Sequence, residues 1–314
     1  MAERRLRASP ALLQVLLPGM ALLVMLGAIF WVQPRAMSYF GLTLLLKLSA
    51  PLVFAALAQM LIILLGDIDL SNGAFVGMVT CIAAVHLEGD PAVAALLLAL
   101  AVGAYVLLGL LIHARELPSI IVSLGASFIW LGAAIIVLPA PGGSVPAWLK
   151  AAMAAKPPLI PLPILIAVVV AAVGQYLLMH TAFGVVLRGA GSNPRAVRRA
   201  AWSIPMVRVT IYGAAALLLV LSGLMLSGII TSGDPNVAPS YTLLGVGAVI
   251  LGGGSFRGGE VSPVGTVLGA LTLSLAGSFL SFLDIPPTWQ IGAQGVILFL
   301  VLAGRVLLDR GRGA

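Results

Sequence analysis

Charged residues are scarce in this chain of 314 residues. Asp, Glu, Lys and Arg make up only 9% of it, whereas 61% of the residues are apolar and the mean hydropathy is +1.15. In a soluble globular domain roughly 25% of the residues are charged. The composition therefore excludes a soluble domain and predicts an all-α, polytopic membrane protein that forms a single transmembrane domain over residues 1–314.

Groups that could carry out chemistry are also few. Cys81 is the one cysteine, so an intramolecular disulfide and a cysteine-rich metal site are excluded. His86, His113 and His180 lie far apart at the ends of predicted spans, where an interfacial histidine is the ordinary explanation. No GxSxG, HExxH, paired-carboxylate or Walker pattern occurs, and GAGSN at 189–193 lacks the Lys-Ser/Thr of a phosphate loop. We therefore expect no catalytic residue, no metal ion and no cofactor bound by this chain.

The apolar runs predict about ten transmembrane helices. The run at 242–251 holds about ten residues, half of the roughly 20 that a crossing helix needs, and indicates a short or broken span. The first run is too long for the apolar region of a signal peptide and no clear cleavage site follows it, so we interpret it as a retained span. In chain order the predicted spans are 11–32, 42–65, 71–87, 92–112, 119–138, 164–179, 209–230, 242–251, 263–282 and 289–308.

The distribution of basic residues orients these spans. Cytoplasmic loops carry an excess of Lys and Arg, and with ten spans only Arg35, Lys150 and Lys156 fall on the side opposite the termini. We therefore expect cytoplasmic N and C termini and a periplasmic loop, with some helix of its own, at 139–163. Topology explains the net charge of +7, and we infer no nucleic-acid partner. The arginines on the side of the termini are Arg4, Arg5, Arg7, Arg115, Arg188, Arg195, Arg198, Arg199, Arg208, Arg257, Arg305, Arg310 and Arg312.

One long polar and basic stretch, residues 184–205, separates the sixth predicted span from the seventh. We call it the basic segment. Asn193 followed by Pro194 predicts a helix start, because the Asn side chain accepts a hydrogen bond from an unpaired N-terminal N–H and Pro has no N–H to leave unpaired. Ile204-Pro205 predicts the end of that helix.

Three arginines share one face of this predicted helix. Arg195, Arg198 and Arg199 fall at positions i, i+3 and i+4, while Ala196 and Val197 belong to the remainder of the two turns. A short basic helix between membrane spans is typical of an element that docks a cytoplasmic partner. The alternative is a loop that is basic only because it fixes the topology.

Glycine-rich stretches interrupt the apolar sequence at two further places. We call residues 66–73 (GDIDLSNG) the first break and residues 251–260 (LGGGSFRGGE) the second break. Asp69 or Ser71 is the expected cap of the helix that follows the first break. Irregular backbone at membrane depth must be shielded by protein or line a water-filled cavity. The two breaks also echo each other weakly, as paired interruptions in the two halves of a transporter do; the alternative is that glycine, with 36 residues, is simply common here.

The basic segment and the two breaks carry the motifs of a known family. GDIDLSNG is similar to that family's GGIDLSxG, GSNPRAVR at 191–198 to its cytoplasmic GxNPxAAR-like motif, and LGGGSFRGGEVSPVGTVLGA at 251–270 to its long and specific LGGxSxxGGxGxxxGTxxGA. Over nearly its whole length the chain resembles the inner-membrane permeases of bacterial ABC importers for ribose, xylose and similar simple sugars, which share a wider family with branched-chain amino acid permeases. It departs at Asp67 and Val261, where Gly is usual, and at 201–202, where Gly-Ile commonly follows the cytoplasmic helix. The departures leave the particular sugar and the particular ATPase open.

The resemblance implies a permease subunit, not an enzyme, that translocates a pentose- or hexose-type sugar across the bacterial inner membrane. The implied partners are a second permease, in a homodimer or a heterodimer, ABC ATP-binding subunits that bind the ATP, and a periplasmic substrate-binding protein. The residues implied in ATPase coupling are Gly191, Asn193, Pro194, Arg195, Ala196, Arg198 and Arg199. Our candidates for the translocation path are Gln59, Asp69, Ser71, Asn72, Gly253, Gly254, Ser255, Gly258 and Gly259.

Other functions remain open on the sequence. The same importer architecture could serve a nucleoside, a branched-chain amino acid or another small polar solute. A stand-alone secondary transporter is expected to carry ionisable residues inside the membrane, and here only Lys47 is clearly of that kind, with Asp67 and Asp69 at the end of a span. A receptor or scaffold is expected to carry a large soluble domain, and the apolar runs predict none.

Overall fold

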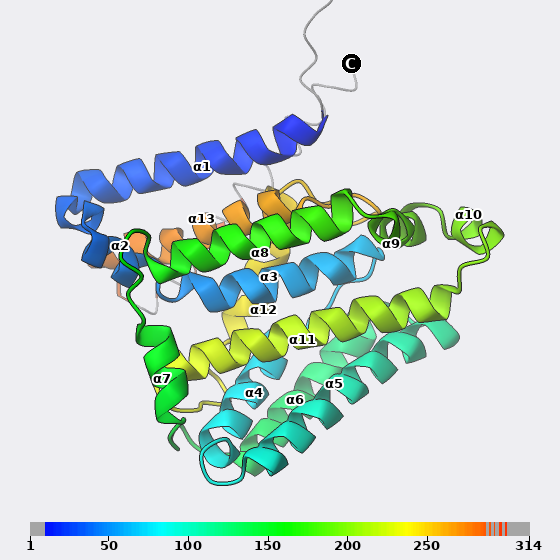
Figure 1. Cartoon of the computed structure of the whole chain (residues 1–314), viewed down its shortest axis with the longest axis horizontal. Coiled ribbons are helices and arrows are strands. Elements are labelled where there is room, and N and C mark those ends of the chain that lie inside the picture. Colours follow the sequence, from blue (N-terminus) through cyan, green and yellow to red (C-terminus); the bar gives the residue numbers. More distant parts are fainter. Residues whose placement is uncertain (1–9, 287–288, 290–291, 293–294, 297–298, 300–314) are drawn as a thin grey trace, which may run out of the picture.

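The computed structural model describes residues 10–286, 289, 292, 295–296 and 299. In this part of the chain the regular structure is helical, and the only β-type pairing is an isolated antiparallel bridge between Gly142 and Gly233. In chain order the elements are α1 (Pro10–Val32), η1 (Pro34–Met37), α2 (Tyr39–Leu46), α3 (Ser49–Leu64), α4 (Asn72–His86), α5 (Pro91–Ala114), α6 (Ser119–Val137), α7 (Ala147–Ala154), α8 (Leu162–Met179), α9 (Ala182–Ser192), α10 (Pro194–Arg199), α11 (Ile204–Ile230), α12 (Pro239–Leu251) and α13 (Pro263–Phe282) (Figure 1).

The long apolar helices agree with the predicted spans. Among the described residues six helices are long and apolar enough to cross a membrane, namely α1, α5, α6, α8, α11 and α13. α2 and α3 together form a seventh candidate that is bent by 44°. The tenth predicted span, 289–308, lies outside the described residues except for isolated positions, so the number of crossings stays a prediction.

Two apolar helices are shorter than a crossing. α4 has 15 residues and α12 has 13, against the roughly 20 that the hydrocarbon core requires. The helix predicted at 71–87 is confirmed within one residue at each end. Whether so short a helix crosses the membrane stays a prediction. A short helix at the predicted eighth span is confirmed, and it begins earlier than predicted because Pro239 is favourable in a first turn. Its crossing of the membrane stays a prediction.

The second predicted span is bent rather than continuous. α2 ends at Leu46 and α3 begins at Ser49, whose hydroxyl donates to the Leu46 carbonyl at 2.6 Å. Pro51 lies in the first turn of α3 and has no N–H to donate to the carbonyl of Lys47. A helix interrupted in this way turns at Lys47, which leaves this lysine at the corner.

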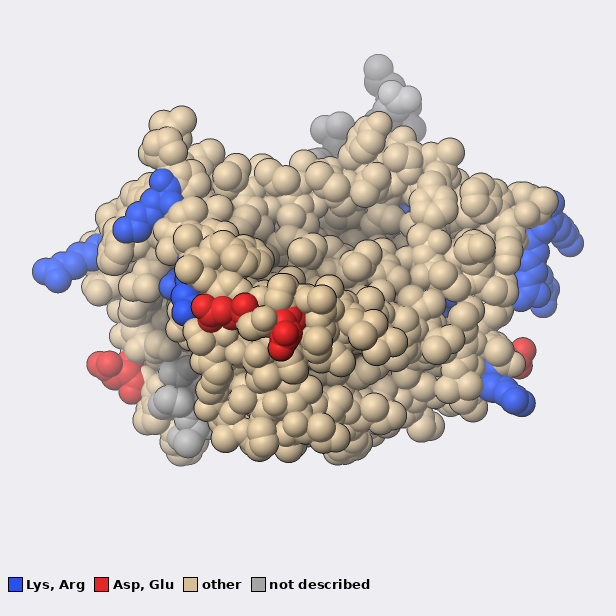
Figure 2. Space-filling model, turned by 60° about the horizontal axis from the view of Figure 1, so that its bottom comes forward, with Lys and Arg blue, Asp and Glu red and all other residues tan. Residues whose placement is uncertain are grey.

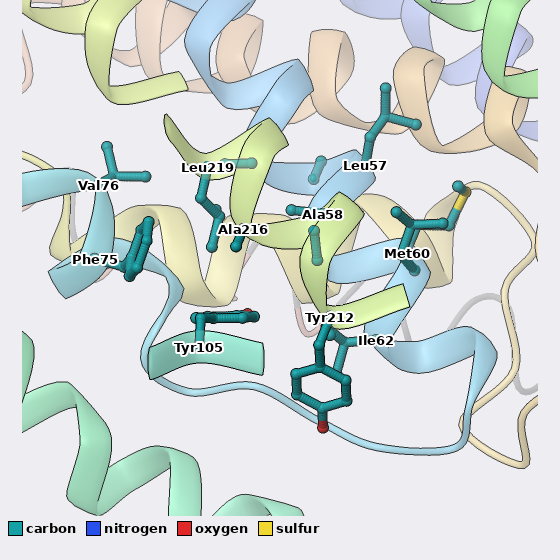
Figure 3. Close-up of a cluster of buried hydrophobic side chains, with 14 of the residues drawn as sticks. Leu57, Ala58, Met60, Ile62, Phe75, Val76, Tyr105, Tyr212, Ala216 and Leu219 are labelled. Atoms are coloured by element: carbon teal, nitrogen blue, oxygen red, sulfur yellow. The ribbon is translucent and has the colours of Figure 1, made fainter. Parts of the chain in front are cut away.

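α3 lies at the centre of the molecule. Every residue of α3 except Phe54 is buried, as expected of a helix that is apolar on all sides. α11, α12 and α13 pack around it. Figure 3 shows side chains of α3, α4, α5 and α11 in one buried cluster, in which Tyr105 and Tyr212 are 1% exposed.

The peripheral helices expose apolar side chains. Leu23 of α1, Leu107 of α5, Ile136 of α6 and Val168 of α8 are between 61% and 85% exposed. Figure 2 shows a broad uncharged surface, with a group of basic side chains at the end where α10 lies in Figure 1. Buried polar backbone inside and apolar side chains outside is the arrangement expected of a protein in lipid.

The predicted loops gather at two opposite ends. At one end Gly142 N donates to Gly233 O at 3.0 Å, Ser144 N donates to Ala84 O at 3.0 Å, and α7 supplies the helix predicted within 139–163. At the other end lie α9, α10 and both breaks (Figure 1). The loops predicted on opposite sides of the membrane thus lie at opposite ends of the molecule. Which end faces the cytoplasm stays a prediction.

Candidate functional site: the basic segment packed on two breaks

The basic segment forms two short helices that begin where local sequence places a cap. The Thr181 hydroxyl accepts from Gly184 N at 3.0 Å and starts α9. The Asn193 side chain accepts from Ala196 N at 3.1 Å, and Pro194 is the first residue of α10. The predicted helix start at Asn193-Pro194 is confirmed.

The predicted end of that helix is wrong. α10 stops at Arg199, and Ala201 follows in the left-handed region with a φ of +61°. Ile204 and Pro205 instead open α11, where the Ser203 hydroxyl accepts from Met206 N at 3.4 Å. Proline fits the first turn of a helix as well as the residues after one, so Ile204-Pro205 marks a start here.

α10 presents its arginines outward. Arg195, Arg198 and Arg199 are exposed and form no ion pair with any described residue, whereas Val197 is only 7% exposed and packs back toward Gly189. The helix lies at the edge of the molecule, beyond α9 (Figure 1). An acidic surface of a partner could therefore approach the basic face without moving other side chains.

The basic segment touches both breaks through backbone atoms. A Cβ atom added to Gly191 would overlap the Leu64 carbonyl oxygen and the Gly259 nitrogen. Gly259 N also donates to Leu64 O at 2.8 Å. A Cβ on Gly258 would lie 2.9 Å from Gly66 N and 3.1 Å from Gly191 O. Glycine is required at this junction, and the three family motifs meet there although they are far apart in sequence.

Asp69 organises the backbone of the first break. Its Oδ1 atom accepts from both the N–H and the hydroxyl of Ser71 at 2.7 Å, and its Oδ2 atom accepts from the Tyr105 hydroxyl at 2.5 Å. Ser71 occupies the cap position of α4 but its side chain accepts no capping hydrogen bond. The expectation that Ser71 is the cap of α4 is confirmed in position. Neither side chain accepts a capping hydrogen bond, because Ser71 donates to Asp69 and Asp69 accepts from Ser71 and Tyr105.

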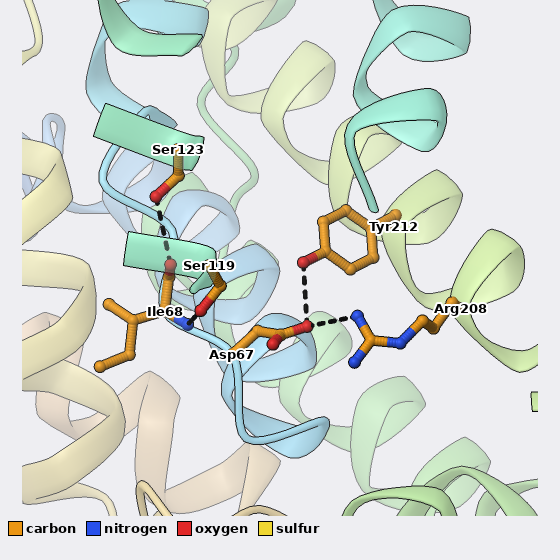
Figure 4. A network of polar contacts seen from close by, with 6 residues as sticks. All are labelled: Asp67, Ile68, Ser119, Ser123, Arg208 and Tyr212. Carbon is orange, nitrogen blue, oxygen red and sulfur yellow. Dashed lines mark hydrogen bonds and ion pairs between the residues drawn. The ribbon is translucent and has the colours of Figure 1, made fainter. Parts of the chain in front are cut away.

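Two serines of α6 satisfy the rest of this backbone. The Ser119 hydroxyl accepts from Ile68 N at 3.0 Å. The Ser123 hydroxyl accepts from Leu70 N at 3.0 Å. It also donates to Ile68 O at 3.2 Å (Figure 4). Buried non-helical backbone is tolerated only where such partners satisfy its N–H and C=O groups.

An ion pair connects the first break to α11. Arg208 Nη1 lies 2.7 Å from Asp67 Oδ2, and the Tyr212 hydroxyl donates to the same oxygen at 3.0 Å (Figure 4). The side chains of Arg208 and Asp67 are 14% and 12% exposed. Sequence reasoning missed this pair. Two features of the sequence could have indicated it. Asp67 stands where the family that the chain resembles usually has glycine, and Arg208 follows just after the basic segment.

The translocation-path candidates of α3 and the first break contact one another and are buried in this chain; they are Gln59, Asp69, Ser71 and Asn72. Gln59 and Asn72 are 0% exposed. The Gln59 amide, with its nitrogen toward the Asp69 carbonyl, bonds the Asp69 backbone at 3.1 and 3.2 Å. Asn72 Nδ2 donates to Ala55 O at 3.0 Å. These two side chains hold the first break against α3, and their place along a path stays a prediction.

The candidates of the second break form a compact turn. Gly253 and Gly258 have φ angles of +95° and +79°, which favour glycine. Gly254 N donates to Val249 O at 2.8 Å, and the Ser255 hydroxyl accepts from Arg257 N at 3.3 Å. This turn ends α12 and carries Gly258 and the following Gly259 to the junction with the basic segment.

Removal of the Asp67 charge should destabilise the chain. Asp67→Asn keeps an oxygen for Tyr212 but leaves Arg208 without its carboxylate, and hydrogen bonds to charged groups contribute roughly 1.5–3 kcal/mol. We expect the free energy of unfolding to fall by this amount, measured as a lower melting temperature of the purified chain in detergent. Glu88→Gln, at an exposed turn, is the matched control and should leave the melting temperature unchanged. Equal effects of both substitutions would contradict a structural role for the pair.

The fold and this site define a class. A helical protein with apolar outer faces, an exposed basic helix and two interrupted helices beneath it has the layout of a transport permease. The chain belongs to the family described as "Branched-chain amino acid transport system / permease component", whose model matches residues 41–302. Family membership confirms the resemblance seen in the motifs.

Individual relatives agree with this family. The chain is 27% identical over 292 residues to the ribose import permease protein of Escherichia coli K12, an alignment that covers 90% of each chain. It is 27% identical over 295 residues to a probable ABC transporter permease protein of Sinorhizobium fredii, covering 92% of this chain and 87% of that one. It is 32% identical over 143 residues to the xylose transport system permease protein of Haemophilus influenzae, covering 46% of this chain and 38% of the relative. No solved structure is significantly similar.

Proposed function

We propose that the chain is the membrane-spanning permease subunit of an ATP-driven, binding-protein-dependent importer for a simple sugar of pentose or hexose type. The similarity to a ribose import permease over 90% of both chains supports the sugar. The description of the family favours one alternative, a branched-chain amino acid. The chain itself hydrolyses nothing in this proposal, and ATP is bound by partner subunits.

The partners follow from the two ends of the molecule. ATP-binding subunits contact α10 at the cytoplasmic end, and a periplasmic binding protein delivers substrate at the opposite end, where α7 lies (Figure 1). A second permease, identical or related, completes the transporter in the bacterial inner membrane. No nucleic acid takes part.

The observation that carries this mechanism is the backbone junction at Gly191. A displacement of α10 by an ATP-binding subunit reaches α9, and through Gly191 it reaches Leu64 at the end of α3 and Gly259 in the second break. Because backbone atoms meet without an intervening side chain, little of the displacement is absorbed. Packed helices that slide past each other are a common means of opening and closing a path.

Transport assays test the proposal and its alternatives together. Proteoliposomes that contain the chain, its ATP-binding subunit and its binding protein should accumulate labelled ribose or xylose only when ATP is supplied. ATP-dependent accumulation of leucine, and of neither sugar, would show that the importer's substrate is a branched-chain amino acid. Accumulation driven by an ion gradient without ATP would contradict the importer and indicate a secondary transporter.

Reporter fusions test the orientation that this function requires. A reporter placed within 189–199 or after Gly313 should be active in the cytoplasm, and one near Lys150 should be active in the periplasm, because ten spans place the arginine-rich loops inside. The measurement is the ratio of alkaline phosphatase to β-galactosidase activity at each site. A periplasmic signal within 189–199 would overturn the ten-span topology.

A further inference from the structure

Lys47 lies at the corner of the bent span between α2 and α3. Its side chain is partly buried, and no described residue forms an ion pair or hydrogen bond with its ammonium group. A lysine near the end of a membrane segment extends its ammonium group to the interface, where anionic groups are its natural counter-ions. The transport mechanism proposed above does not use this lysine, so its partner has to be sought elsewhere.

A second lysine lines the same cleft. Lys47 and Lys156 border a cavity of about 180 Å³ between α2, α3, α7, α8 and α11, which we call the lysine cleft. Lys156 likewise has no ion-pair partner among the described residues. The remaining walls are largely apolar and include Leu44, Ile166, Met225 and Ile229. Two unpaired cations thus lie beside a groove that repels polar ligands.

The depth of the lysine cleft matches a membrane surface. α3 has 16 residues from Ser49 to Leu64, which corresponds to about 24 Å of helix. Lys47 precedes α3 and the first break follows it, so the two lie roughly one hydrocarbon thickness of about 30 Å apart. The lysine cleft is therefore at the interface opposite the basic segment, at the height of lipid headgroups.

We propose that the lysine cleft binds an anionic phospholipid of the outer leaflet. The phosphate lies between the ammonium groups of Lys47 and Lys156, and one acyl chain runs along Leu44, Ile166 and Ile229. The phosphate supplies the negative charge that no described residue provides to the two lysines, and the acyl chain covers the apolar groove. Because the lipid contacts both helices at the corner, it supports the bend between α2 and α3.

Native mass spectrometry of the detergent-purified protein tests this proposal with phosphatidylglycerol as the probe. Phosphatidylglycerol should bind at least tenfold more tightly than phosphatidylcholine with the same acyl chains. Lys47→Gln and Lys156→Gln should each weaken it about fivefold, the contribution typical of one basic residue at an anionic surface. Leu44→Gln should also weaken it, and because Leu44 is 65% exposed the substitution should leave the fold intact.

The control is Lys150→Gln. Lys150 lies in the neighbouring α7, its ammonium group donates to the Ser144 hydroxyl at 3.1 Å, and it does not border the lysine cleft. Three results would overturn the proposal: equal affinity for the two lipids, an equal effect of Lys150→Gln, or binding of sn-glycerol 3-phosphate as tight as that of the lipid. A lysine substitution that changes the dimer fraction in light scattering without changing lipid affinity would assign the cleft to a second permease chain instead.

Discussion

Replacement of Val197 by proline should uncouple ATP hydrolysis from transport while the membrane helices remain inserted. Val197 N donates to Asn193 O at 3.3 Å, the first i to i−4 hydrogen bond of α10. Proline removes this donor and its ring clashes with the carbonyl four residues earlier, at a cost of about 3 kcal/mol or more. This cost lowers the population of the six-residue helix roughly 100-fold. We expect loss of the co-purified ATP-binding subunit, or loss of its stimulation by loaded binding protein.

Two variants of α10 control this experiment. Val197→Ala shortens the same buried side chain but keeps the N–H, so most coupling should remain. Arg198→Ala removes one exposed charge, and an exposed pair contributes only about 0.2–1 kcal/mol, so its effect should be mild. Full binding and full stimulation in Val197→Pro would mean that the basic segment is only a loop that fixes topology.

Replacement of Gly191 by leucine should abolish most transport. The added side chain has no space, since its Cβ already overlaps the Leu64 carbonyl and the Gly259 nitrogen. Gly253→Leu and Gly258→Leu should act similarly, because their φ angles of +95° and +79° impose strain of about 1–2 kcal/mol on any other residue. At Gly258 the added side chain also clashes with the first break and with Gly191. Overpacking alone typically contributes about 1–3 kcal/mol. We expect uptake to fall at least tenfold in all three variants.

Gly103→Leu is the matched control for these glycines. Gly103 lies in mid-helix of α5, and a Cβ atom there meets nothing within 4 Å. Its uptake should stay close to that of the unaltered chain. Both uptake and the amount of assembled transporter need to be measured, because tight packing alone predicts lost assembly, whereas a role in coupling predicts assembled but inactive transporter. Equal tolerance at Gly103 and Gly191 would contradict the importance of the junction.

Local sequence predicts where the elements of this site begin. Asn193-Pro194 could be identified as a helix start because a cap involves residues only three positions apart. The end of α10 could not, because it depends on Ala201 in a left-handed conformation, which nothing in the residue type indicates. Pro205 is ambiguous for a physical reason, since its missing N–H is harmless after a helix and in the first turn of the next one.

Contacts between distant residues were the part that the sequence could not supply. Glycines and acids mark the first break as irregular, but its stabilising partners lie 36 residues away at Tyr105 and 145 residues away at Tyr212. Hydropathy predicts the helix at 71–87, which agrees with α4, but it does not predict how the irregular chain before this helix is held. The N–H groups of Ile68 and Leu70 donate to serine hydroxyls of α6, which lie 51 and 53 residues further along the chain.

Cross-linking from α10 tests the central claim most directly. Cys81 is 0% exposed, so a cysteine introduced at Arg198, which is exposed, is the reactive thiol of the described residues. In intact cells Arg198→Cys should resist a membrane-impermeant maleimide, whereas Lys150→Cys should be labelled. In membranes a short thiol-to-amine reagent should join Arg198→Cys, but not Lys150→Cys, to the ATP-binding subunit. Labelling of Arg198→Cys from outside, or its failure to reach the ATP-binding subunit in an active transporter, would contradict the account.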